Sequence, residues 1–166
     1  FAFRAKPGTR TVFVVHDETE ASRKHLESLS RVMKTGYPHA AVRTMGDLTY
    51  AQIRRAISSL PHDSIVFFIS FWRDGAGRPV STEELETVLK ASSVPVFGRS
   101  GWLIGRGLAG GKCVTGFSQG KAAASLARQI LDGVPVSALP RVLESPNQFI
   151  FDHAEFKEHG ISGAII

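Results

Sequence analysis

The segment 116–120, GFSQG, has the G-x-S-x-G pattern of a nucleophile elbow, in which a serine on a sharp strand-to-helix turn attacks an acyl carbon. Ser118 would be the nucleophile, and it would need an acid and then a histidine from later strands. The short remainder of the chain offers two aspartates and two histidines for these roles, Asp132, Asp152, His153 and His159. We favour the alternative that Ser118 caps the following helix and that Gly120 lets this helix pack closely. A serine hydrolase is therefore a less favoured function than binding.

Two glycine-rich patterns resemble nucleotide-binding loops but lack the required surroundings. The segment 105–110, GRGLAG, fits G-x-G-x-x-G but precedes a strand, whereas the dinucleotide fingerprint opens a helix whose N-terminus meets the pyrophosphate. The pair Gly111-Lys112 is no P-loop, because Cys113 follows the lysine and supplies no hydroxyl for magnesium. The six histidines form no i, i+4 pair, and we interpret most of them as surface residues. The sequence predicts neither a cofactor nor a metal site.

Aromatic and charged side chains that follow four short apolar runs could bind a small molecule. In a parallel sheet, ligands bind outside the carboxyl ends of the strands. Rings there supply apolar contact, while arginine and aspartate fix the orientation of a zwitterion or an aromatic molecule. An equally weighted alternative is that Phe71 and Phe97 simply complete the core. The candidate ligand-binding residues are His16, Asp17, Thr44, Phe71, Trp72, Arg73, Asp74, Phe97 and Arg99.

The elements that must position these residues follow a βα pattern from residue 11 to residue 99. Short apolar runs alternate with longer amphipathic stretches, which is typical of a parallel sheet with helices on both faces. The third run, at 64–71, is the most apolar and should lie centrally. Gly36 should end the first helix in a left-handed conformation, and Ser81 with Glu84 should form a capping box. The predicted strands are 11–15, 40–44, 64–71 and 94–97, and the predicted helices are 18–34, 49–60 and 81–90.

The pattern changes after this region, because residues 98–111 contain six glycines and indicate a loop or hinge. Beyond it the sequence predicts a short strand at 112–115 and a helix at 119–131 that ends before Gly133 and Pro135. Two further strand-like runs, at 141–143 and 148–151, precede a last short helix at 153–159.

The composition of the 166 residues is that of one globular domain. It is 43% hydrophobic and 21% charged, and no apolar run is long enough for a transmembrane helix. The net charge is +5, but the 20 Lys and Arg are scattered among 15 acids, so we expect no nucleic-acid binding. The single cysteine, Cys113, excludes an internal disulfide and leaves the cellular compartment open.

Short patterns in a fixed order cover nearly the whole chain. They are RTVFVV at 10–15, LPHDSIV at 60–66, DGAG at 74–77, VPVFG at 94–98, GRGLAGG at 105–111, GKAA at 120–123, ILDG at 130–133, FD at 151–152 and HGI at 159–161. In this order and spacing the chain resembles the second half of the substrate-binding-protein family of ABC transporters, in the version fused to bacterial sensor histidine kinases.

The resemblance implies a type I periplasmic-binding-protein fold, in which two α/β lobes joined by three crossovers hold a ligand between them. Residues 1–104 would then be a flavodoxin-like lobe of the C-terminal type. Residues 105–134 would be a glycine-rich crossover with a strand and a helix that belong to the other lobe, and residues 135–166 would return and exit. Most of the first lobe is absent from these residues. We therefore expect the helix at 119–131 to pack against a neighbouring chain or to fold back on the sheet.

The resemblance also implies a function without catalysis. The chain would be part of an extracytoplasmic sensor domain of a two-component signalling protein, anchored to the inner membrane by its parent. Its partners would be an amino acid or a small carboxylate, the missing first lobe and the kinase region, with a homodimer also open. The alternative is a solute-binding component of an ABC transporter.

Overall fold

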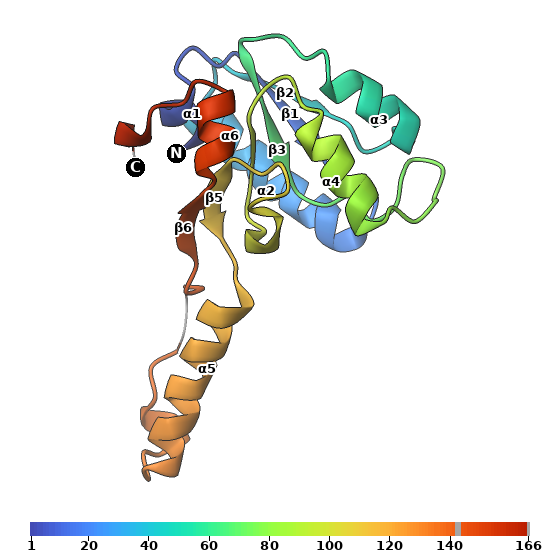
Figure 1. Ribbon diagram of the computed structural model, residues 1–166. Coiled ribbons are helices and arrows are strands. Elements are labelled where there is room, and N and C mark those ends of the chain that lie inside the picture. The colour runs from blue at the N-terminus through green and yellow to red at the C-terminus, as the bar shows by residue number, and fades with distance from the viewer. Residues whose placement is uncertain (142–143, 166) are drawn as a thin grey trace.

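A single six-stranded sheet forms the centre of the computed structural model, which describes residues 1–141 and 144–165 (Figure 1). The strand order is β2-β1-β3-β4-β5-β6. The first five strands are parallel, and β6 is antiparallel to β5, so the sheet is mixed where the sequence predicted a parallel one. Strand β3 lies centrally, next to β4, as predicted. The strands are β1 (Thr11–Val15), β2 (Ala41–Thr44), β3 (Ser64–Phe68), β4 (Val96–Gly98), β5 (Gly110–Cys113) and β6 (Gln148–Phe151).

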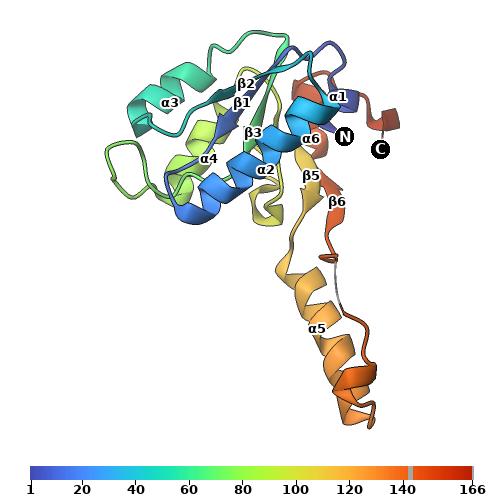
Figure 2. The same ribbon diagram turned by 180° about the vertical axis from the view of Figure 1, so that it is seen from behind.

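Helices cover both faces of this sheet. Figures 1 and 2 show α3 and α4 on one face and α2 on the other. Successive residues of a strand point to opposite faces, so β3 contributes Val66 and Phe68 to the core under α3 and α4, and Ile65 to the core under α2. The α-helices are α1 (Ala2–Ala5), α2 (Glu20–Gly36), α3 (Tyr50–Ile57), α4 (Thr82–Lys90), α5 (Gly116–Leu131) and α6 (His153–Glu158), and the 3-10 helices are η1 (Gly101–Leu103), η2 (Val136–Ala138) and η3 (Gly163–Ile165).

Local side-chain chemistry sets where these helices begin and end. The predicted capping box of Ser81 and Glu84 opens α4. The prediction for Gly36 was wrong, because this glycine lies in the last turn of α2 and has no positive φ. The helix ends at Gly36, and Tyr37 is its C-cap with a non-helical backbone, since a residue that precedes a proline is disfavoured in the helical region. The Tyr37 ring then stacks on Phe3, with 4.1 Å between the ring centroids.

Several predicted boundaries shift in the structure. Strand β3 stops at Phe68, and residues 69–71 continue toward the next loop. Strand β5 starts earlier than predicted, at Gly110, because the glycine pair runs close to its neighbours. A side chain on Gly111 would collide with the backbone carbonyl of Gly98. The predicted strand at 141–143 falls largely outside the described residues.

Helix α5 forms an arm that leaves the body of the molecule (Figure 1). The chain runs out along α5 and returns beside it, and the backbone N–H of Val134 donates to Gln129 at 3.0 Å. Ser118 is the one buried residue of the helix. The expectation that this helix folds back on the sheet was therefore wrong, while packing against a neighbouring chain stays a prediction. Large apolar side chains are left exposed along the arm, namely Phe117, Ile130, Leu131 and Val136.

No helix in the described part of the chain is both long and apolar enough to span a membrane.

Candidate functional site

Two tryptophans meet at the carboxyl edge of the sheet. Trp72 follows β3, and Trp102 lies in η1, which follows the neighbouring strand β4. Their rings are stacked, with 5.4 Å between centroids and 18° between planes. They are 46% and 43% exposed, and they are the only tryptophans among the 166 residues. Exposed aromatic surface at the edge where α/β sheets bind ligands makes this pair the centre of a candidate site.

Asp17 holds the first tryptophan in place. Its buried carboxylate accepts hydrogen bonds from the Trp72 backbone N–H at 3.1 Å and from the Thr19 hydroxyl at 2.7 Å. Burial alone would raise the pKa of Asp17, but the hydrogen bonds from Thr19, Trp72 and Ser70 outweigh it and leave this pKa below its ordinary value. The carboxylate thus ties the end of β1 to the loop after β3, and its oxygens are already engaged within the protein.

Asp74 organises the loop that follows Trp72. Its carboxylate accepts from the backbone N–H groups of Arg78 at 2.9 Å, Ala76 at 3.1 Å and Tyr50 at 3.1 Å. The Tyr50 hydrogen bond is the largest influence on the Asp74 pKa, and with the other two it outweighs burial and lowers that pKa. The carboxylate therefore fastens the loop to the start of α3.

The other candidates differ in accessibility. Phe71 and Phe97 are buried in the two cores, where they support the edge from beneath. Thr44 is exposed at the end of β2, the edge strand that lies two strands from β3. Arg73 and Arg99 are exposed, and the guanidinium of Arg73 donates to the Gly77 carbonyl at 3.1 Å. The arginines and Thr44 are the sequence-derived candidates, besides Trp72, that a ligand could reach.

His16 is buried, against the expectation that most histidines lie on the surface. Its ring packs on Gly46, where any side chain would overlap it, and its Nδ1 lies 3.2 Å from the Asp17 backbone oxygen. His159 is largely buried as well, beside Glu155. Exposed positions hold His39, His62 and His153.

Sequence reasoning missed Trp102. It lies in the segment 98–111, which the glycines indicated to be a loop or hinge. The side chains between these glycines were therefore not among the predicted binding residues. The available signal was its position just after a predicted strand, at the same edge as Trp72.

Ser118 does not have the geometry of a nucleophile elbow. Helix α5 already begins at Gly116, and Thr115, not Ser118, is the N-cap whose hydroxyl accepts from the Ser118 N–H at 3.1 Å. The Ser118 hydroxyl donates to the Thr115 carbonyl at 3.1 Å, and no described residue other than glycine has a positive φ. Open space surrounds the position that a Cβ on Gly120 would take, so no described residue packs closely there.

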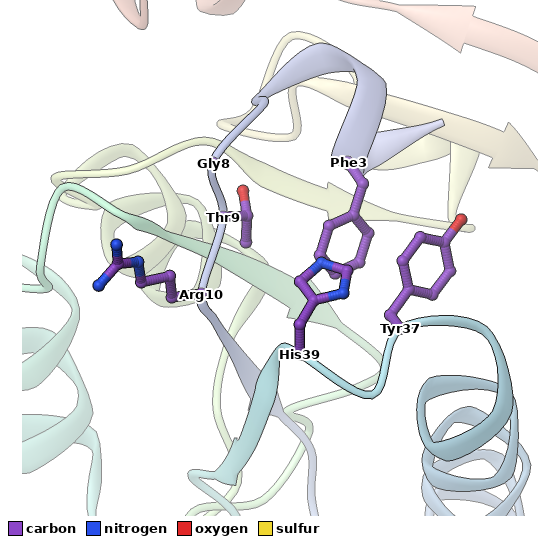
Figure 3. Close-up of a pocket in the computed structure, with 6 residues that line it drawn as sticks. All are labelled: Phe3, Gly8, Thr9, Arg10, Tyr37 and His39. Atoms are coloured by element: carbon purple, nitrogen blue, oxygen red, sulfur yellow. The ribbon is translucent and has the colours of Figure 1, made fainter.

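A shallow hollow of about 540 Å³ lies at the opposite, amino edge of the sheet (Figure 3). The rings of Phe3, Tyr37 and His39 gather on one side of it, while the guanidinium of Arg10 points away from them. Polar groups do not converge in this hollow, so it defines no ligand. No group of His, Cys, Asp and Glu in the described residues is arranged to hold a metal ion.

Comparisons with known proteins identify the fold. No family model matches the sequence, and no curated protein matches it either. The chain is similar to a ligand-free, open substrate-binding protein with adhesive properties from Clostridium difficile, with a TM-score of 0.68 at 20% identity over 95% of this chain and 52% of that one. It is also similar to an ABC domain in complex with L-Trp from Streptococcus pneumoniae, with a TM-score of 0.65 at 14% identity over 98% of this chain and 55% of that one.

A conserved domain protein from Vibrio cholerae O1 biovar El Tor gives a TM-score of 0.62 at 17% identity, over 99% of this chain and 55% of that one. The chain thus spans about half the length of these structures. The chain therefore shares the fold of these structures over about half their length, and the predicted fold class, a layered α/β fold with helices on both faces of the sheet, is confirmed.

Proposed function

We propose that the carboxyl edge of this sheet is one wall of a small-molecule site, and that a second lobe supplies the other wall. The observation that carries this proposal is the stacked pair Trp72 and Trp102. Exposed tryptophan surface is unfavourable in water, and a planar ligand or a closing lobe would bury it. Asp17 and Asp74 hold the loop beneath the pair before any ligand arrives, so little ordering would be needed on binding.

The arm supports a two-lobed organisation. In this proposal residues 1–104 form one lobe, residues 105–134 contain a strand and a helix that belong to the other lobe, and residues 135–166 return. The exposed apolar side chains of α5, such as Phe117 and Leu131, would pack on that other lobe. A chain that spans about half the length of its structural neighbours is consistent with this division.

The ligand that fits best is a small molecule with a planar ring and a carboxylate, such as an aromatic amino acid. The ring would stack on the tryptophan pair, and the carboxylate would pair with Arg73, which directly follows Trp72. The neighbour from Streptococcus pneumoniae is in complex with L-Trp, which agrees with this class. The role requires no catalysis, because lobe closure on the ligand is itself the signal.

Two biological settings would use such a site. One is an extracytoplasmic sensor domain of a histidine kinase, anchored to the inner membrane, in which closure biases the kinase. The other is the solute-binding component of an ABC transporter, and neighbours that include a substrate-binding protein support it equally. Sequencing the gene beyond the codon for Ile166 distinguishes them, because only the sensor continues into transmembrane and kinase segments.

Intrinsic fluorescence tests the site directly, because both tryptophans of these residues are in it. We expect aromatic amino acids to change the fluorescence of the intact protein saturably and to raise its melting temperature. A ligand at 100 times its Kd stabilises the folded state by about 2.7 kcal/mol. Trp102→Leu should weaken binding at least tenfold, whereas Phe149→Leu, at an exposed aromatic position on β6, should not. Unchanged affinity in Trp102→Leu, or no response to any amino acid or small carboxylate, would refute the proposal.

A further inference from the structure

A groove separate from the tryptophan pair lies on the sheet face that α2 covers. Phe67 and Phe97, paired in the register of β3 and β4, line its floor, with Gly98 and Gly111 adding no side chains. Helix α2 forms one wall, Phe149 of β6 lies on the other side, and residues 1–3 also line the groove, with the Phe1 ring 6.2 Å from the Phe149 ring. The volume is about 390 Å³, which is within the range of small-molecule sites, roughly 300–1,000 Å³.

The two sides of this groove leave apolar surface in water. Val32 on α2 is 57% exposed, and Phe149 on β6 is 59% exposed. An apolar body between them would bury both side chains, which the hydrophobic effect favours. The lining residues of α2 extend from Leu29 to Tyr37, which is about 12 Å of helix at 1.5 Å per residue. A ligand that contacts this whole length of helix would be elongated.

Two cations also line the groove, near the carboxyl edge. Arg99 follows β4, Lys112 lies in β5, and both are exposed. Within the described ranges 1–141 and 144–165, neither has a carboxylate partner within salt-bridge distance. Arg99 lies close enough to His25 on α2 that its charge, after the larger effect of burial, lowers the pKa of that imidazole. The groove thus combines apolar walls with positive charge.

We propose that this groove binds an amphipathic monocarboxylate with an elongated alkyl body. The alkyl chain lies between α2 and β6 along the floor of Phe67 and Phe97. The carboxylate pairs with Arg99 and Lys112, where a charge-assisted hydrogen bond is stronger than a neutral one. This site does not depend on the tryptophan pair, and its ligand needs no planar ring.

Calorimetric titration of the full chain with hexanoate, octanoate and decanoate tests the alkyl part. Each methylene group that the groove buries contributes about 0.8 kcal/mol, so affinity should rise about fourfold per added methylene. Val32→Glu places a carboxylate in the apolar wall and should lower the affinity for decanoate at least tenfold. Val136→Glu makes the same change at an exposed position on the arm and should have no effect.

Lys112→Gln tests the charged part. This substitution should lower the affinity for decanoate several-fold and leave the affinity for decanol, an uncharged molecule of the same length, unchanged. The control Lys121→Gln on α5 should change neither affinity. These exposed positions tolerate the substitutions, and thermal melts confirm that each variant is folded. Trp72→Ala should leave decanoate affinity intact even where it abolishes binding of aromatic amino acids, so the two proposals fail separately. The groove proposal is overturned if decanoate does not bind, if affinity is independent of chain length, or if Val32→Glu and Val136→Glu behave alike.

Discussion

Replacing Asp17 with asparagine should lower the free energy of unfolding by about 2–3 kcal/mol at pH 7. The wild-type carboxylate accepts hydrogen bonds from the Trp72 N–H and from Thr19, and hydrogen bonds to charged groups contribute about 1.5–3 kcal/mol. Asparagine keeps the shape but has one acceptor oxygen, so its NH2 group must face either the Trp72 N–H or the Thr19 N–H, which donates to the other carboxylate oxygen at 3.2 Å. The buried donor left unpaired costs about 1–3 kcal/mol.

The stability difference between wild type and Asp17→Asn should depend on pH in one direction. The folded-state pKa of Asp17 lies below its ordinary value of 3.8, so its contribution is complete well above that value. The contribution is lost as the pH falls through the folded-state pKa. The difference between wild type and Asp17→Asn should therefore be constant near neutral pH and should shrink as the pH falls below about 4.

Urea unfolding between pH 3 and pH 7, followed by circular dichroism, measures both effects. Asp132→Asn is the matched control, because Asp132 is exposed and its one salt bridge within residues 1–141 and 144–165 is to Arg128 at 3.6 Å. The free energy of unfolding of Asp132→Asn should stay within about 0.5 kcal/mol of the wild-type value. The reasoning fails if Asp17→Asn destabilises no more than the control, or if its deficit is the same at pH 3 and pH 7.

Three further substitutions test the packing and the absence of a nucleophile. Gly46→Ala should lower the free energy of unfolding, measured in urea, by about 1–3 kcal/mol, because its methyl group would overlap the buried His16 ring. A variant as stable as wild type would show that this ring can move aside. Phe97→Ala should lower stability by about 3–5 kcal/mol, measured by thermal melts, whereas Phe149→Ala, at an exposed position, should lower it far less. Equal losses of stability would contradict the assignment of Phe97 to the core. A fluorophosphonate probe should leave the protein unlabelled, and labelling that disappears in Ser118→Ala would restore the hydrolase alternative.

The parts of the fold that local patterns specify could be predicted from the sequence. The apolar run at 64–71 identified the central strand because a strand buried on both faces needs continuous apolar residues. The Ser81 and Glu84 pair located the start of α4 because a capping box involves residues only three apart. Gly36 was misjudged because the end of α2 depends on Pro38 and on stacking with the distant Phe3.

The candidate site was only partly predictable. Strand ends pointed to Trp72 because the carboxyl edge of a parallel sheet follows from the βα order. Whether Asp17 faces a ligand or holds a loop could not be predicted, since that depends on a backbone N–H 55 residues away. Trp102 was hidden for the same reason, because its partner is the ring of a residue on another strand end.

The sequence by itself determined the layered α/β class and most helix starts, because these follow from hydrophobic period and capping. The order of the strands also located the edge at which we propose that a ligand binds. Tertiary structure alone decided which side chains remain open at that edge. It buried His16, Asp17 and Asp74 in internal contacts, stacked two tryptophans 30 positions apart, and extended α5 away from the sheet. Such outcomes depend on contacts between residues far apart in the chain, and no local pattern encodes them.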